Sequence, residues 1–262
     1  MKAHVHKTEL LEGKNIFSKK NYEAVLFDLD GVITTTEKNH SACWKKTFDE
    51  FLRLRAEETG EPFIPFDETE DYLRCVDGKP RYEGVRSFLH SRAIELPEGN
   101  RNSPKDELSV FGLGNRKNQM FTETLEKQPP EIYRTSVELA LSLKEAGFRL
   151  AIVSSSRNCR RVMAAAGIEH LFELAVDGIV AGEKGLRGKP EPDTFIEAAR
   201  ALGSKPGRTV VIEDAAAGVA AGARGGFGLV IGVARKQNEE ELLLNGADVV
   251  VRDLGEFQSH YK

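Results

Sequence analysis

Short apolar segments alternate along this chain with segments of helical periodicity. Five continuous apolar runs are bounded by turn-forming residues, at positions 24–27, 150–153, 210–212, 229–233 and 249–251. Strands covered on both faces of a parallel sheet have this composition. Between the runs, residues 137–144 and 195–202 follow a 3.6-residue period, and each pattern stops at a glycine. The alternation from residue 131 onward predicts an α/β fold, a Rossmann-like doubly wound parallel sheet that binds ligands at the carboxyl ends of its strands.

Residues 37–128 interrupt this alternation and predict an inserted helical domain. The apolar side chains of Trp44, Phe48 and Leu52 lie on one face of an amphipathic helix, and a second helical pattern begins near Val85. Residues 96–109 are polar and rich in turn formers, which indicates a mobile surface loop. The predicted domains are therefore a sheet-containing core at 1–36 and 129–262 and a helical domain at 37–128.

Composition excludes several classes of protein. The 262 residues include 37 Lys and Arg against 41 Asp and Glu, and 40% are hydrophobic, as in an ordinary globular protein. The slight negative charge argues against a nucleic-acid partner, because phosphate backbones bind to patches of excess Lys and Arg. No run approaches the roughly 18 apolar residues of a membrane helix, and the amino-terminal segment lacks the apolar core of a secretory signal. We therefore expect a cytoplasmic protein without a membrane partner, and a monomer.

Three cysteines, Cys43, Cys75 and Cys159, are widely spaced. No second cysteine stands close enough to any of them to form a metal-binding pair. We expect three buried thiols without a chemical role.

Two aspartates follow the first apolar run. Asp28 and Asp30 are separated by one residue, so in an extended chain their side chains point the same way. They could be solvated acids at a strand end. However, a buried strand would bring them into mutual repulsion, which a hard cation such as Mg²⁺ would relieve.

A second acidic pair, Glu213 and Asp214, follows the run at 210–212, where a strand gives way to a helix. Asp214 could simply cap that helix. Four acids at two strand ends favour a metal site over two unrelated caps, provided that the two strands are neighbours.

Two further segments suggest phosphate binding. The run at 150–153 leads into Ser154-Ser155-Ser156-Arg157-Asn158, where hydroxyls and a guanidinium precede a helix. Helix starts attract phosphate, although a serine cap alone would explain one of the hydroxyls. Lys189 lies between Gly188 and Pro190 in a stiff turn before another helix, and taken alone it is a weak signal.

In combination these residues resemble the four motifs of the haloacid dehalogenase-like phosphotransferases. The motifs occur in order at strand ends, as Asp28-Leu29-Asp30-Gly31, Ser154, Lys189 and Glu213-Asp214, and the resemblance spans residues 22–235. It implies that Asp28 is a nucleophile that forms an aspartyl-phosphate and that Asp30 is the general acid and base. It also implies that Ser154 and Lys189 bind the phosphoryl oxygens and that Mg²⁺ is held by Asp28, Asp30, Glu213 and Asp214. The helical insert would be a cap domain.

Other positions are similar to the β-phosphoglucomutase subfamily, with an additional loop around 96–112. That narrower resemblance implies that the sugar and its distal phosphate bind to Thr36, His40, Arg81, Lys117, Ser156, Arg157 and Asn158. We expect a Mg²⁺-dependent phosphohexomutase that acts on a small-molecule sugar phosphate, interconverting β-glucose 1-phosphate and glucose 6-phosphate. A phosphatase acting on a hexose or trehalose phosphate is the alternative, because both enzymes would use Asp28 and Asp30. A binding module without catalysis is disfavoured, because Asp28, Asp30 and Lys189 are all present.

Overall fold

The computed structural model describes residues 16–235 and 237–260. Residues 36–129 form one compact unit, here named the helical unit, and the described residues on either side form another, named the sheet unit. These bounds differ by one residue at each end from the predicted domain boundaries. The amino-terminal segment that was examined for a secretory signal lies, up to residue 15, outside the described residues. Within the described part of the chain, no helix is both long and apolar enough to cross a membrane.

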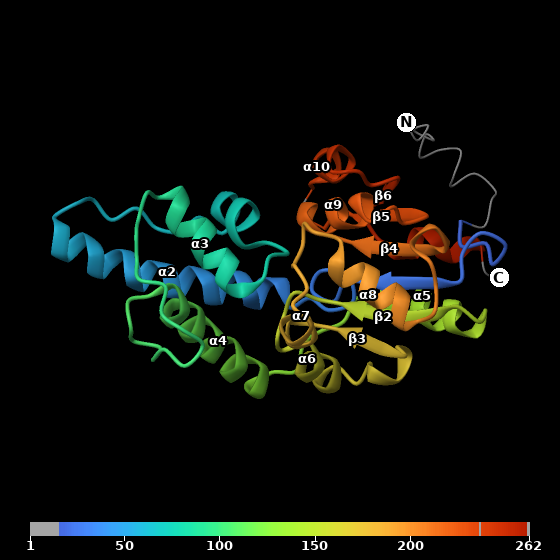
Figure 1. The fold of residues 1–262 in the computed structure, drawn as a ribbon, viewed down its shortest axis with the longest axis horizontal. Coiled ribbons are helices and arrows are strands. Elements are labelled where there is room, and N and C mark those ends of the chain that lie inside the picture. Colours follow the sequence, from blue (N-terminus) through green and yellow to red (C-terminus); the bar gives the residue numbers. More distant parts are fainter. Residues whose placement is uncertain (1–15, 236, 261–262) are drawn as a thin grey trace. The chain divides into compact units, whose positions relative to one another are not determined.

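The sheet unit is built on six parallel strands in the order β3-β2-β1-β4-β5-β6 (Figure 1). Their bounds are β1 Ala24–Phe27, β2 Arg149–Val153, β3 Leu174–Val176, β4 Thr209–Glu213, β5 Leu229–Val233 and β6 Val249–Val251. The predicted α/β fold with a doubly wound parallel sheet is confirmed. Sequence analysis missed β3, because Leu174 and Ala175 are not β-branched, whereas the three valines of β6, an edge strand of the same length, favour a strand.

The register of the central strands determines which residues leave the sheet together. Phe27 of β1 pairs with Ile152 of β2 on one side and with Ile212 of β4 on the other. The residues that follow, Asp28 and Glu213 among them, therefore emerge side by side at the carboxyl edge. The strands that lead into the two acidic pairs, β1 and β4, are therefore neighbours, as the prediction of a shared metal site required.

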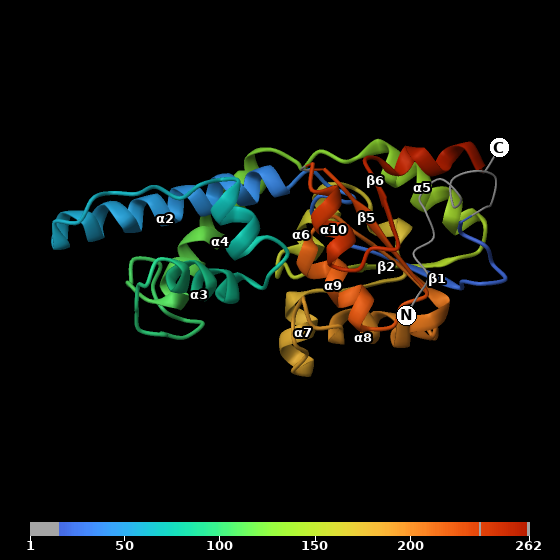
Figure 2. The same cartoon turned by 90° about the horizontal axis from the view of Figure 1, so that it is seen from above.

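Helices cover both faces of this sheet (Figure 2). Helices α8 (Asp193–Ala201) and α9 (Ala216–Arg224) pack on one face, and α5 (Arg134–Glu145) packs on the other. Alternate strand residues such as Leu26 and Val211 join Phe195 in one apolar core. Shorter helices complete the unit: α6 (Cys159–Ala165), α7 (Gly178–Lys184) and α10 (Glu239–Leu244).

The helical unit contains α2 (Glu37–Thr59), a π-helical turn at Tyr72–Val76, α3 (Arg81–Ser91) and α4 (Val110–Lys127). An aromatic cluster forms its core, as the apolar spacing of α2 predicts. The ring of Phe48 stacks on that of Phe88, with centroids 3.9 Å apart, and on that of Trp44 at 5.1 Å. All three cysteines are free and buried, as expected.

Residues 96–109 form a loop in this unit, but the loop is extensively anchored. The amide of Val110 donates to the carbonyl of Pro97 at 3.0 Å, and the amide of Phe111 donates to that of Glu98 at 3.1 Å. Ser103 and Ser109 are buried within it. These bonds satisfy polar groups that sequence analysis assigned to solvent in a mobile loop.

Candidate active site

Asp28, Lys189 and Glu213 form a buried charged cluster at the carboxyl edge of β1 and β4. The ammonium nitrogen Nζ of Lys189 lies 2.5 Å from Oδ1 of Asp28 and 2.5 Å from Oε1 of Glu213. It also donates to the carbonyl of Val153, the last residue of β2, at 3.1 Å. The exposed fractions of the three residues are 7%, 3% and 1%, so this cluster is shielded from water. Lys189 therefore contacts residues at the ends of three neighbouring strands, β1, β2 and β4.

The electrostatics of this cluster follow from burial and from an excess of negative charge. Burial raises the pKa of the Asp28 carboxyl well above its usual range; Lys189 opposes that rise, and the charges of Glu213 and Asp30 add to it. Burial alone would lower the pKa of Lys189, but Asp28 and Glu213 raise it above its ordinary value. Lys189 is therefore a permanent cation. The single ammonium of Lys189 pairs with two carboxylates, so it balances only part of the negative charge that they carry when ionised.

Gly31 allows the second acidic pair to approach the first. Its φ of 92° lies in the left-handed region, and a Cβ on this residue would stand 2.2 Å from Oδ2 of Asp214. The carboxylate of Asp214 thus packs directly on the turn that carries Asp28 and Asp30. Only glycine permits this approach.

The predicted metal ligands have different surroundings in the structure. In residues 16–235 and 237–260, no three His, Cys, Asp or Glu side chains converge closely enough to hold an ion as they stand. Oε1 of Glu213 accepts from Lys189, and Oε2 accepts from the amide of Ala215 at 2.8 Å. Both carboxylate oxygens of Glu213 therefore have protein partners, in Lys189 and at the start of α9. Asp28 and Asp214 offer carboxylate oxygens and Asp30 offers a backbone carbonyl, and these oxygen donors fit the chemistry that Mg²⁺ prefers.

The predicted phosphate segment forms a tight turn after β2. Ser154 is buried, and its Oγ accepts from the amide of Ser156 at 3.1 Å. Oγ of Ser156 accepts from the amide of Asn158, also at 3.1 Å, and the Arg157 guanidinium donates to the carbonyl of Gly178. These bonds fix the backbone of the turn and keep its hydroxyls at the strand end.

The other predicted residues lie in the helical unit and form separate groups. Thr36 is buried at the start of α2, and its carbonyl accepts from the amide of His40. Lys117 contacts Nδ1 of His40, and its ammonium lies 5.0 Å from the ring centroids of Trp44 and Phe121. Nη2 of Arg81 donates to Oδ1 of Asn118, the residue that follows Lys117 on α4.

Two residues that sequence analysis missed support the acidic loops. Nδ2 of Asn238 donates to the carbonyl of Asp214 at 3.2 Å, and Nε of Arg235 donates to the carbonyl of Gly31 at the same distance. Both residues follow β5, the strand next to β4. Neither residue stands in a motif. Their position after the apolar run at 229–233 was the available sequence signal, because parallel strands end at a common edge of the sheet.

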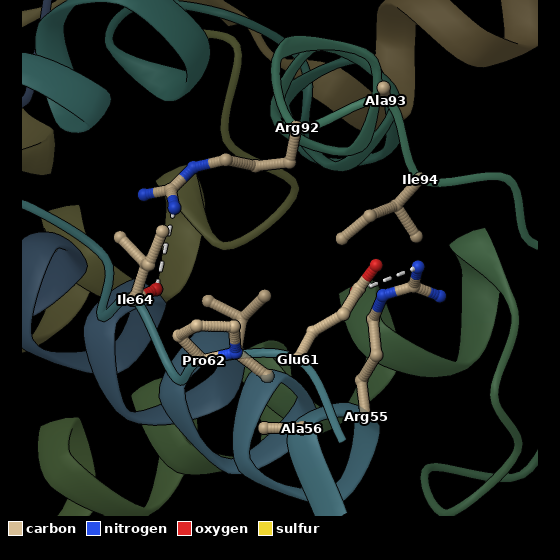
Figure 3. Close-up of a pocket in the computed structure, with 9 residues that line it drawn as sticks. Arg55, Ala56, Glu61, Pro62, Ile64, Arg92, Ala93 and Ile94 are labelled. Carbon is tan, nitrogen blue, oxygen red and sulfur yellow. Dashed lines mark hydrogen bonds and ion pairs between the residues drawn. The ribbon is translucent and has the colours of Figure 1, made fainter. Parts of the chain in front are cut away.

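A separate pocket of about 280 Å³ lies within the helical unit (Figure 3). Arg55 pairs with Glu61 at 3.3 Å on its rim, and Arg92 donates to the carbonyl of Ile64. None of the predicted site residues is among those that line it. Its arginines are already paired, and the predicted catalytic carboxylates of Asp28 and Asp30 lie in the sheet unit.

Comparisons with known proteins agree with this arrangement. Residues 22–226 match the family of haloacid dehalogenase-like hydrolases. The β-phosphoglucomutase of Mycobacterium bovis is 46% identical over 236 residues, which cover 89% of this chain and 90% of that protein. The phosphorylated carbohydrates phosphatase of Thermotoga maritima is 29% identical over 231 residues, covering 87% and 93%.

Among solved structures, the β-phosphoglucomutase of Clostridium difficile has a TM-score of 0.70 and covers 91% of this chain and 98% of its own. Its sequence identity of 23% shows a shared fold. The match over residues 22–226 extends across both the sheet unit and the helical unit. The chain is therefore an enzyme of the haloacid dehalogenase-like hydrolase family, close in sequence to β-phosphoglucomutase.

Proposed function

We propose that this protein is a Mg²⁺-dependent phosphohexomutase that interconverts β-glucose 1-phosphate and glucose 6-phosphate through an aspartyl-phosphate. The buried cluster of Asp28, Lys189 and Glu213 is the observation that carries this proposal. It presents a carboxylate oxygen beside a permanent cation, which is what transfer of a phosphoryl group requires. The 46% identity to a protein named β-phosphoglucomutase supports the choice of substrate.

The chemistry assigns a separate role to each side chain. A carboxylate oxygen of Asp28 forms a bond to one phosphorus of glucose 1,6-bisphosphate while the bond from that phosphorus to the sugar oxygen breaks, so the other phosphate stays on the sugar that leaves. Asp30 gives its proton to that leaving oxygen, and in the second half-reaction it takes a proton from the sugar hydroxyl that attacks the aspartyl-phosphate. Lys189 and the hydroxyl of Ser154 hold the negatively charged phosphoryl oxygens.

Mg²⁺ would be held by Asp28, Asp30 and Asp214, and when bound it would neutralise charge on the phosphoryl oxygens. We expect exhaustive treatment with EDTA to abolish turnover and added Mg²⁺ to restore it, whereas Zn²⁺ should restore little. Steady-state turnover across a Mg²⁺ titration measures this dependence. Full activity after chelation would contradict the metal requirement, and unchanged thermal denaturation in EDTA would show that the fold itself remains intact.

A sugar-phosphate phosphatase is the second candidate. The similarity to the phosphorylated carbohydrates phosphatase of Thermotoga maritima favours it, and the same residues would serve. The two functions differ in whether a sugar hydroxyl or water attacks the aspartyl-phosphate. We expect ³¹P NMR of the enzyme with Mg²⁺, β-glucose 1-phosphate and a trace of glucose 1,6-bisphosphate to show glucose 6-phosphate accumulating. Accumulation of inorganic phosphate instead would replace the mutase with the phosphatase.

A mutase must also hold the phosphate that is not being transferred. Arg81 suits this role, because a guanidinium binds phosphate through two parallel hydrogen bonds. We expect Arg81→Ala to lower mutase turnover about 10- to 100-fold, in keeping with the loss of a charge-assisted contact. Hydrolysis of acetyl phosphate, which has no second phosphate, should change far less. Arg86→Gln, on the same helix, is the matched control, and equal loss of both activities in Arg81→Ala would remove Arg81 from this role.

A further inference from the structure

The loop at residues 97–109 has a fixed backbone. Its first residues are bonded to the start of α4, as described above, and at its other end Oγ of Ser109 accepts from the amide of Gly112 at 3.0 Å. Nε of Arg116 donates to the carbonyl of Lys105 at 2.8 Å. Oγ of Ser103 accepts from the amide of Asn100 and donates to Oε1 of Glu107, both at 2.9 Å. The carbonyl groups of this loop therefore have defined positions.

Asn115 of α4 connects this loop to α3. Its Nδ2 donates to the carbonyl of Ser103 at 2.9 Å and to that of Arg101 at 3.3 Å. Its Oδ1 accepts from the hydroxyl of Tyr82 at 2.8 Å. The amide nitrogen and the amide oxygen of Asn115 thus both have partners. Because the loop carbonyls hold the nitrogen, their position determines where the oxygen holds the Tyr82 hydroxyl.

Tyr82 in turn packs beside Arg81 at the start of α3. The guanidinium of Arg81 lies 5.7 Å from the centroid of the Tyr82 ring, and its Nη2 donates to Oδ1 of Asn118 at 2.6 Å. A Cβ on Gly114 would lie 2.7 Å from two ring carbons of Tyr82 and 3.4 Å from Cδ of Arg81. Helix α4 therefore packs directly against both side chains, with no room for a larger residue at Gly114.

We propose that the 97–109 loop is a positioning element for Arg81, acting through Asn115 and Tyr82. A long arginine side chain loses rotamer freedom when it binds a phosphate, and a side chain already held in place loses less. The loop thereby favours sugar phosphates that carry a phosphate within reach of Arg81. This inference rests on the proposed role of Arg81 in the mutase and extends it to residues outside every motif.

Two variants each remove a different hydrogen bond between the loop and Tyr82. Asn115→Asp keeps an acceptor for Tyr82 but replaces the donor to the loop carbonyls with a carboxylate, and Tyr82→Phe keeps the ring but removes its hydroxyl. We expect each to raise the KM for β-glucose 1-phosphate about three- to tenfold, the value of one or two hydrogen bonds, with a smaller change in kcat. Arg86→Gln, which breaks only the exposed pairs with Glu83 and Glu98, is the control for a general disturbance of the loop.

A double-mutant cycle shows whether the effect passes through Arg81. In an Arg81→Ala background, Asn115→Asp and Tyr82→Phe should raise KM less than twofold further, since the residue that they position is gone. If each variant raises KM by the same factor with and without Arg81, the loop does not act through Arg81 and the inference is overturned.

A measurement without substrate separates this inference from the proposed function. The side-chain Nε–H resonance of Arg81, in ¹⁵N-labelled protein, should shift or broaden in Asn115→Asp and in Tyr82→Phe and stay unchanged in Arg86→Gln. An unchanged resonance in both variants overturns the inference even if the enzyme is a mutase. Release of inorganic phosphate in the ³¹P assay would overturn the mutase while this resonance still reports on the loop. If Asn115→Asp does not fold, Tyr82→Phe decides the outcome.

Discussion

Asp28→Asn is expected to abolish phosphoryl transfer while the protein stays folded. An amide oxygen cannot take the place of a carboxylate that must form a bond to phosphorus, so turnover should fall by on the order of 10⁴-fold or more. The substitution keeps the volume of the side chain, and Lys189 retains its pairing with Glu213. Release of glucose 6-phosphate or inorganic phosphate measures the loss, and thermal denaturation measures the fold.

Asp177 provides a matched control for this substitution. It directly follows β3 at the same edge of the sheet and is fully buried, but its Oδ1 caps α7 by accepting from the amides of Ile179 and Val180. Asp177→Asn should retain the capping acceptor and most of the activity. Turnover near wild type in Asp28→Asn, or an equal loss in both variants, would remove Asp28 from the role of nucleophile.

Lys189→Met is expected to remove activity and also to destabilise the protein. It leaves the carboxylates of Asp28 and Glu213 buried without their common cation, and breaking a buried ion pair in this way costs about 3–5 kcal/mol of the free energy of unfolding. Denaturant titration at neutral pH measures that cost. Adding Glu213→Gln to Lys189→Met removes one of the two stranded charges and should recover part of the stability without restoring turnover.

The destabilisation should depend on pH in a defined direction. Burial already raises the pKa of Asp28 in the wild-type protein, and loss of Lys189 removes the charge that opposes this rise. A carboxyl whose folded-state pKa exceeds its unfolded value favours the folded state below the ordinary value of about 4 and loses that contribution as pH rises. The stability difference between wild type and Lys189→Met should therefore be smaller at pH 4 than at pH 8. A stability difference that is independent of pH would contradict the explanation that Lys189→Met leaves buried carboxylates without a cation.

Several features of the site follow from local sequence patterns. Asp28 and Asp30 are predicted together because alternate residues of an extended chain face one way. Glu213 joins them because continuous apolar runs identify both β1 and β4 and parallel strands end at one edge. The edge strand β3 escapes this reasoning, because Leu174 and Ala175 are not β-branched, whereas the three valines of the equally short β6 favour a strand.

Sequence alone determined the α/β class, the helical insert and which residues can take part in chemistry, since these depend on residue type and on short-range periodicity. Only the tertiary structure decided how those residues are used. The pairing of Lys189 with Asp28 joins positions 161 residues apart, and its pairing with Glu213 gives that carboxylate a protein partner that no local pattern predicts. The anchoring of the 97–109 loop likewise involves Asn115, which accepts from Tyr82, a residue 33 positions away along the chain. Such contacts are decided by which polar groups burial leaves to be satisfied, and that depends on the packing of the whole chain.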